Sequence, residues 1–372
     1  MVILYVDDLL LIHKSKSMNE TVISELSKTF NLERTSKGDG MYSYLGMNIY
    51  FDNSIVHFSM KQFIQHLLNE YGPTKPYTSP ATSTLFDVEK DPKAITDQER
   101  KRFHTFTAKL LYLCNRIRPD IALAVSYLTT RVTCATNSDV NKLDRLMGYI
   151  QHTKHCELKF NIDPSATRLI AYIDASFCVH HDGKSHSGMI LQFCGATIMA
   201  KSTKQSLVSK SSTESELIAL SDYCTVVMEV HDCLSEMKLT TNVPIIFQDN
   251  ESVLKFISNG NFSHRTRHLK ARSSFVTELI SNKRMDVEKL DTTLMLADVM
   301  NKVLSGKLFR LFVDKIMGLA PDSIDKIMKI ESDRNDDAVD HDRDSTKKMI
   351  SHDIESKINL RERVDDYATA CM

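Results

Sequence analysis

Several features that would narrow the class of this protein are missing from its sequence. No stretch of the 372 residues has the length and apolar content of a membrane span, and residues 1–5 contain neither a basic leader nor a small-residue cleavage site. The eight cysteines include no Cys-x-x-Cys pair and no regular spacing, which argues against a disulfide framework or a zinc site. We therefore expect an intracellular protein, cytoplasmic or nuclear, with no membrane contact.

A strong net charge is also missing. The whole chain has a formal charge of −1, which at first argues against a nucleic-acid partner. The charge is unevenly distributed, however, because residues 321–372 contain 14 Asp and Glu against 9 Lys and Arg, a net of −5. The preceding residues therefore carry about +4, and the acidic segment 320–372, poor in aromatic residues, is predicted to be disordered or loosely helical.

The first half of the chain has the periodicity of mixed strands and helices. Residues 2–12 predict a hairpin that turns at Asp7-Asp8, because two short apolar runs flank these acids. Further elements are predicted as a helix at 18–30, strands at 44–49 and 55–58, a helix at 60–71 and a proline-rich linker at 72–92. Residues 102–151 look entirely helical, with helices that open after Pro119 and after Asn137-Ser138.

After residue 157 the pattern changes to a mixed α/β order. Strands are predicted at 158–160, 169–173, 188–193, 196–201, 243–248 and 285–290, and helices at 213–234, 251–258, 269–280 and near Leu296. The fold class predicted for the chain is α/β, with a mixed sheet in the second half.

Four acids of this second half fall at the ends or centres of predicted elements. They are Asp174, Glu216, Asp249 and Asp298. Each has an ordinary structural explanation: a strand-end turn for Asp174, a capping box with Thr213 for Glu216, an N-cap or turn for Asp249, and an exposed helix position for Asp298. Taken together they fit phosphodiester hydrolysis, which uses hard oxygen ligands to hold two divalent ions.

The order of several motifs resembles one known family. Tyr5-Val6-Asp7-Asp8 resembles the polymerase-palm signature of reverse transcriptases, and the segment Arg118–Leu128 is similar to the one that joins reverse transcriptase to RNase H. Later stretches match that family's RNase H motifs in order and approximate spacing: Tyr172–Ala175, Lys184–Gly188, Ser212–Leu220, Asp249-Asn250 and Leu296–Asp298. Over residues 1–319 the chain resembles the copia-type long-terminal-repeat retrotransposon polyprotein.

The resemblance implies an organisation into four parts. Residues 1–85 would be a truncated reverse-transcriptase palm remnant and 86–157 a helical connection or thumb-like subdomain. Residues 158–319 would form an RNase H-like domain, followed by the acidic segment 320–372.

The resemblance also implies roles for the acids. Asp174, Glu216, Asp249 and Asp298 would be catalytic ligands of two Mg²⁺ ions, with Mn²⁺ as an alternative metal and Glu214 as an alternative to Glu216. The substrate would be an RNA–DNA hybrid.

Asp7 and Asp8 would be two of three polymerase carboxylates. The third should lie upstream of the Tyr-Val-Asp-Asp turn, so we do not expect polymerase activity from this chain alone. An upstream reverse-transcriptase portion would be its partner.

Contacts with the nucleic-acid backbone are predicted at two basic stretches. The candidates are Lys201, Lys204, Arg265, Arg267 and His268. A solvated surface explains each stretch equally well. Two departures from the family suggest drift: Phe177 replaces the usual Trp in a chain without any Trp, and Lys270 replaces an Asp.

Two hypotheses therefore stand at this point. The first is a Mg²⁺-dependent ribonuclease H that cuts the RNA strand of RNA–DNA hybrids. The second is a catalytically inactive retroelement remnant that at most binds nucleic acid. Retention of all four acids favours the first hypothesis, whereas the truncated start within the palm and the unfamiliar acidic tail favour the second.

Overall fold

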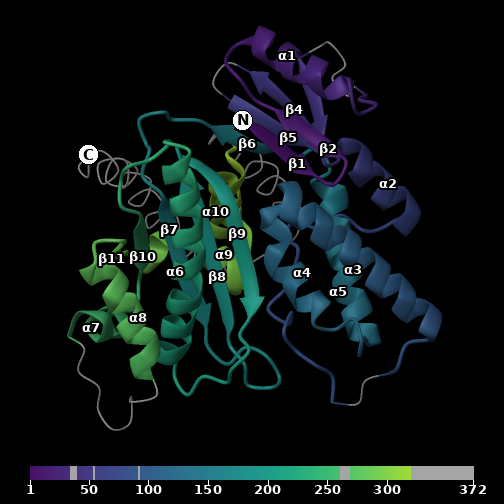
Figure 1. Ribbon diagram of the computed structural model, residues 1–372. Helices are drawn as coiled ribbons and strands as arrows, with labels where there is room; N and C mark the ends of the chain where they lie inside the picture. The colour runs from purple at the N-terminus through teal and green to yellow at the C-terminus, as the bar shows by residue number, and fades with distance from the viewer. Residues whose placement is uncertain (34–39, 53–54, 91–92, 260–268, 320–372) are drawn as a thin grey trace. The chain divides into compact units, whose positions relative to one another are not determined.

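The computed structural model describes residues 1–33, 40–52, 55–90, 93–259 and 269–319 (Figure 1). The chain divides into a unit of residues 1–319 and a unit of residues 320–372, and the second lies outside the described residues. No helix in the described part of the chain has the length and apolar content that a membrane crossing requires.

The chain opens with a hairpin and an antiparallel sheet. Strands β1 (Val2–Tyr5) and β2 (Asp8–Leu11) pair antiparallel, and helix α1 (Lys16–Ser27) follows. The next sheet, which we call the antiparallel sheet, has the order β3-β4-β5-β6. Its strands are β3 (Met41–Tyr44), β4 (Met47–Asp52), β5 (Ile55–Ser59) and β6 (Leu158–Asn161).

Helices fill the sequence between β5 and β6. They are α2 (Lys61–Tyr71), α3 (Asp97–Ile117), the short 3-10 helix η1 (Pro119–Ile121), α4 (Ala122–Thr129) and α5 (Asn137–His152). Helix α3 begins at a capping box, in which Thr96 and Glu99 satisfy each other's backbone N–H groups. Pro119 stands at the first position of η1, where a missing N–H costs nothing.

The second half of the chain forms a mixed sheet with helices on both faces. Its strand order is β11-β10-β7-β8-β9, in which β7, β8 and β9 are antiparallel in turn while β10 and β11 run parallel to β7. The strands are β7 (Ile170–Ser176), β8 (His186–Phe193), β9 (Ala196–Lys204), β10 (Ile245–Gln248) and β11 (Asp286–Lys289).

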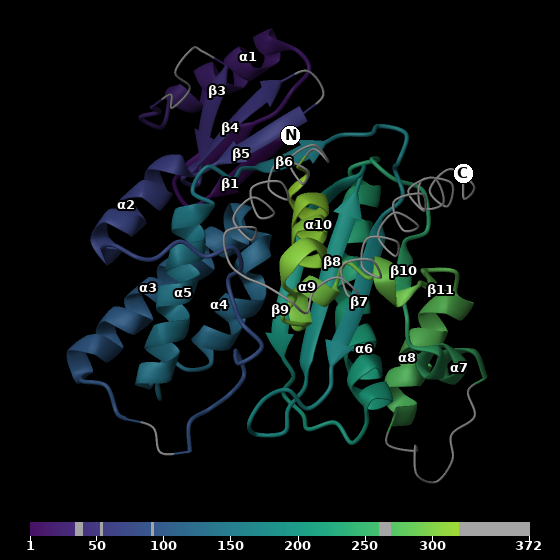
Figure 2. The same cartoon turned by 180° about the vertical axis from the view of Figure 1, so that it is seen from behind.

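The helices of this region divide between the two faces of the mixed sheet. Helix α6 lies over one face (Figure 1), and α9 and α10 lie over the other (Figure 2). The bounds are α6 (Ser212–Glu236), α7 (Glu251–Asn259), α8 (Lys270–Ser281), the 3-10 helix η3 (Thr292–Leu294), α9 (Asp298–Asn301) and α10 (Gly306–Met317).

Alternate residues of β7 enter two separate apolar cores, as the period of a strand requires. Ala171 and Ile173 pack in the core beneath α6. Tyr172 packs in the other core, which also contains side chains of α2, α3, α4, α5, α9 and α10. The second core therefore joins the helices before β6 to the α9 face of the mixed sheet.

The predicted α/β fold class is confirmed. An α+β segment and a helical segment are followed by a mixed-sheet α/β region. Two local predictions are corrected, and one helix is added. Residues 44–49 are not one strand, because Leu45 and Gly46 both have positive φ and turn the chain from β3 into β4. Residues 102–151 are not wholly helical, since residues 130–136 separate α4 from α5. Helix α10 was not predicted at all.

The strand at Leu158 also has an unexpected partner. It was assigned to the RNase H-like region, yet β6 pairs with β5 in the antiparallel sheet, with Leu158 opposite Phe58. The pairing partner of a strand this short depends on distant chain, which local alternation does not reveal.

Candidate metal centre

Strand β7 places Asp174 in the middle of the mixed sheet. The residue is paired with Gly188 of β8, and only 1% of its surface is exposed. By alternation it shares the face of Tyr172, which is the face covered by α9. The strand-end turn explanation for Asp174 is therefore wrong, because the strand continues for two more residues.

Glu216 lies in the second turn of α6 rather than at its start. The N-cap is Ser211, whose hydroxyl accepts a hydrogen bond from the Glu214 N–H, and Glu214 in turn accepts one from the Lys210 N–H. The capping explanation offered for Glu216 is therefore wrong, since the first-turn acid is Glu214. Glu216 is 6% exposed, and its Oε2 has no hydrogen-bond partner among the described residues.

Asp249 follows the carboxyl end of β10, the parallel neighbour of β7. The capping role expected there belongs to Asn250, whose Oδ1 accepts hydrogen bonds from the N–H groups of Ser252 and Val253. Asp249 is left half-buried and faces the other acids.

Asp298 is the first residue of α9 and is 7% exposed, so it is not an ordinary surface acid. Four residues later Lys302 folds back on it: the Lys302 Nζ lies 2.8 Å from Asp298 Oδ1 and 3.0 Å from Asp174 Oδ2. Between them Asn301, fully buried, donates its Nδ2–H to Asp174 Oδ2 at 2.8 Å. The end of α9 therefore ties Asp298 to Asp174.

The structure brings the four predicted acids together. Asp174, Glu216 and Asp249 offer carboxylate oxygens that lie within 4.8 Å of one another, and Asp298 adjoins them through Lys302. Glu214 is not part of this group. Asp174 lies in a strand of the mixed sheet, Asp249 directly follows another strand, and Glu216 and Asp298 lie in helices on opposite faces of the sheet, so the acids span more than a hundred residues of sequence.

Electrostatics within the cluster oppose the charged state of its acids. Burial, reinforced by the charges of Asp174 and Asp249, raises the pKa of Glu216 well above its usual value. Burial and the charge of Asp174 also raise the pKa of Asp249. Burial raises the pKa of Asp298 to about 7, although Lys302 acts in the opposite direction. Negative charges this close together destabilise the folded protein unless cations neutralise them.

Gly188 allows α9 to approach the sheet closely. A Cβ at this position would lie 2.8 Å from the Ala297 carbonyl oxygen and 2.8 Å from the Met300 Cβ. Any side chain at residue 188 would push α9, and with it Asp298, away from Asp174. Glycine is therefore needed here for space rather than for an unusual backbone angle.

The other predicted site residues lie apart from this cluster. Asp7 and Asp8 are exposed at the hairpin turn. Lys201 is exposed on β9, and Lys204 on the same strand forms an ion pair with Asp182 at 2.8 Å. The remaining candidates, Arg265, Arg267 and His268, fall outside the described residues.

Sequence reasoning missed three residues of the site. Asn301 and Lys302 stand three and four positions after Asp298, the spacing that places side chains on one helix face, and this signal could have identified them. The third is Gln205, which is buried and donates hydrogen bonds to the Ser187 hydroxyl and the Ser215 carbonyl. It links β8 to the helix that carries Glu216.

The chain as a whole is similar to known proteins. No protein-family profile matches the chain. The chain is 25% identical to a retrovirus-related Pol polyprotein from transposon TNT 1-94 of Nicotiana tabacum, over 83% of the chain and 24% of that protein. It is 26% identical to the Pol polyprotein from transposon RE1 of Arabidopsis thaliana (84% and 21%), and 24% identical to the Ty1-NL2 Gag-Pol polyprotein of Saccharomyces cerevisiae (84% and 19%).

The homologues of this chain are Pol polyproteins of copia-type retrotransposons. The expected resemblance is confirmed. The chain spans between 19% and 24% of the length of these Pol relatives.

Solved structures of an RNase H and of a reverse transcriptase show some likeness to this Pol homologue. LC11-RNase H1 isolated from compost has 14% identity over 36% of this chain and 93% of its own, with a TM-score of 0.30. The foamy viral protease-reverse transcriptase in complex with dsDNA has 14% identity over 37% and 93%, with a TM-score of 0.28.

Proposed function

We propose that residues 158–319 act as a ribonuclease H that hydrolyses the RNA strand of RNA–DNA hybrids. In this proposal residues 1–85 are the remnant of a reverse-transcriptase palm, and residues 86–157 are the helical connection. The observation that carries the proposal is the convergence of Asp174, Glu216 and Asp249 within 4.8 Å, with Asp298 adjoining, in a homologue of Pol polyproteins.

The residues of the cluster fit divalent cations. All four acids offer hard carboxylate oxygens, the ligands that Mg²⁺ and Mn²⁺ prefer. The buried Oε2 of Glu216, which has no hydrogen-bond partner in the described structure, is an acceptor that a cation would satisfy. When bound, two such ions would supply activation of water and stabilisation of the leaving oxygen. Asp174, Glu216, Asp249 and Asp298 would hold them.

Other residues of the chain would orient these ligands. Asn301 fixes one oxygen of Asp174 by a 2.8 Å hydrogen bond, and Gln205 anchors the start of α6 against β8. Ligand orientation by such hydrogen bonds is a general property of metal sites. The substrate backbone would contact Lys201, which is exposed on β9. Lys204 would first have to exchange its ion pair with Asp182.

The test is hydrolysis of a labelled RNA–DNA hybrid by the 372-residue protein with Mg²⁺. We expect cleavage of the RNA strand only, and a loss of at least about 100-fold in Asp174→Asn and Glu216→Gln, since even outer-shell changes cost 10- to 100-fold. Glu229→Gln is the matched control, because Glu229 is an exposed acid on the same helix as Glu216. It should cleave at the rate of the unmodified protein.

Two results would contradict the proposal. One is a folded, metal-binding protein that leaves the hybrid intact, which would favour the catalytically inactive remnant. The other is cleavage that persists in both Asp174→Asn and Glu216→Gln, which would place the catalytic site elsewhere.

A further inference from the structure

The acidic cluster already has a cation of its own, the ammonium group of Lys302. Its Nζ lies 3.0 Å from Asp174 Oδ2 and 2.8 Å from Asp298 Oδ1, so it bridges acids from a strand and a helix that are 124 positions apart. Asp174 is 1% exposed and Asp298 7% exposed, and the Lys302 side chain itself is 35% exposed. The two acids of the bridge are therefore buried, whereas the lysine side chain is partly exposed.

An ammonium group and a divalent cation compete for the same carboxylate oxygens. Mg²⁺ binds carboxylate oxygen at about 2.0–2.1 Å and demands near-octahedral geometry. A lysine ammonium beside those oxygens adds a positive charge that repels the ion in a region of low dielectric constant. Lysine nevertheless suits reversible occupation, because its flexible four-carbon stem carries a single compact charge.

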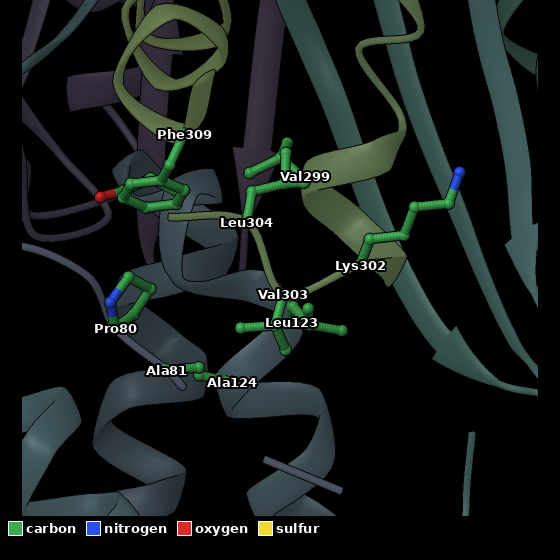
Figure 3. Close-up of a pocket in the computed structure, with 10 residues that line it drawn as sticks. Pro80, Ala81, Leu123, Ala124, Val299, Lys302, Val303, Leu304 and Phe309 are labelled. Atoms are coloured by element: carbon green, nitrogen blue, oxygen red, sulfur yellow. The ribbon is translucent and has the colours of Figure 1, made fainter. Parts of the chain in front are cut away.

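The packing of α9 determines where the Lys302 side chain starts. Lys302 is one of the residues around a small pocket, together with Leu123 and Ala124 of α4, Val299 of α9 and Leu304, and Figure 3 shows its side chain extending away from the other labelled residues, with the ammonium at the far end. The backbone of Lys302 is therefore held beside the apolar residues of α4 and α9, while the charged end of its side chain lies at the acids. A rotation of this partly exposed side chain is enough to release Asp174 and Asp298.

We infer that Lys302 is a built-in counter-cation, which neutralises Asp174 and Asp298 in the metal-free protein and competes with divalent ions for them. This inference rests on the proposed metal site. It makes Lys302 a positioning residue: its charge holds the two ligands together before metal binds and lowers the affinity of the site for metal. The same charge offsets the repulsion that the cluster would otherwise impose on the fold.

The inference is tested by Mn²⁺ binding to the full chain, followed by electron paramagnetic resonance and by calorimetric titration. We expect Lys302→Met to bind Mn²⁺ about tenfold more tightly, a change of about 1.4 kcal/mol. Lys302→Arg keeps the charge and should stay within about twofold of the unmodified protein. Lys307→Met is the matched control, because Lys307 is an exposed lysine on α10, and it should not alter Mn²⁺ binding.

A second measurement covers the case in which Lys302→Met folds poorly without metal. Its circular-dichroism signal is then followed against Mn²⁺ concentration, and recovery of the folded signal supports the inference. Equal or weaker Mn²⁺ affinity in Lys302→Met, or no recovery of folding with Mn²⁺, would overturn it. Failure of the proposed nuclease function looks different, because the unmodified protein would bind Mn²⁺, Lys302→Met would bind it more tightly, and neither would cleave the hybrid.

Discussion

At the scale of single residues, two buried histidines connect a loop of the mixed sheet to α9. His180 Nε2 lies 3.0 Å from His186 Nδ1, His186 Nε2 lies 2.8 Å from the Ser202 hydroxyl, and that hydroxyl donates to the Met300 carbonyl at 2.6 Å. Because the Ser202 proton goes to Met300, His186 donates from Nε2. Burial favours the neutral form of both rings, in which His186 Nδ1 accepts a hydrogen bond from the Nε2–H of His180, and a proton added to His186 Nδ1 would then face that N–H.

This chain of hydrogen bonds predicts a loss of stability in acid. Burial lowers the pKa of His180 to about 4 and that of His186 to about 3, both below the ordinary value of 6.5. The unfolded chain therefore binds protons that the folded chain does not bind. The contribution of the two histidines to the free energy of unfolding is fully present above pH 6.5 and is lost as the pH drops toward 4 and 3. Near pH 5 each histidine should contribute about 1.4 kcal/mol per pH unit to this slope.

The measurement is urea unfolding between pH 7 and pH 4.5. His186→Gln should have a shallower dependence of the unfolding free energy on pH than the unmodified protein. His104→Gln, at an exposed position on α3, should keep the original slope. Identical slopes in all three proteins would show that His186 is not held neutral by the fold.

At the scale of elements, the short helix α9 carries most of the unusual features of the site. It holds Asp298 and Asn301, it is followed at once by Lys302, and Gly188 leaves room for it against β8. A helix of four residues has little stability of its own, so tertiary contacts must hold it. On the side away from the sheet, Val299 meets Leu123 of α4 in the pocket of Figure 3. The helical segment before β6 thus supports the metal centre.

This arrangement predicts that a core residue outside the mixed sheet affects metal binding. Leu123→Ala should destabilise the protein by about 2–5 kcal/mol, as is usual for buried leucine, and should also weaken Mn²⁺ binding by loosening α9. Leu68→Ala, in the same core but on α2, should cost similar stability without changing Mn²⁺ affinity. Unfolding curves compare the stabilities of the two variants. Mn²⁺ titrations, at a temperature where both variants are folded, compare their metal affinities. Equal effects on Mn²⁺ affinity would contradict it.

At the scale of the whole molecule, the candidate metal ligands are spread over the fold. The acids of the centre come from β7, α6, β10 and α9, and one apolar core joins α9 and α10 to α2–α5. Unfolding any of these elements separates the ligands. A metal that binds only the assembled cluster therefore stabilises the fold as a whole.

We accordingly expect Mg²⁺ to raise the thermal unfolding temperature of the unmodified protein. The stabilisation should reach about 2.7 kcal/mol when Mg²⁺ is at 100 times its dissociation constant. Asp249→Asn should remove most of this gain, while its metal-free form should be no less stable than the unmodified protein, because one of the mutually repelling acids is neutralised. Differential scanning calorimetry with Mg²⁺ or EDTA measures both effects. An undiminished gain in Asp249→Asn would exclude this residue as a ligand.

Local patterns were enough to predict much of this molecule. Alternation and helical spacing identified the hairpin at Asp7-Asp8, strands β7 to β11 and helix α6, because side-chain periodicity reports which face of an element is buried. The order of the motifs also indicated the family.

Only the tertiary structure decided how these elements combine. Asp174 and Asp249 meet because β7 and β10 lie side by side and run parallel. In this register Ile245 pairs with Ile170, although 74 residues lie between them in the sequence. Local sequence favoured a cap for Glu216, a turn for Asp174 and a different sheet for Leu158. The cap of α6 is a local matter, since Ser211 rather than Thr213 stands at the N-cap. For Asp174 and Leu158 the physical cause is strand pairing, which brings distant residues together, so that no short window of sequence contains both partners.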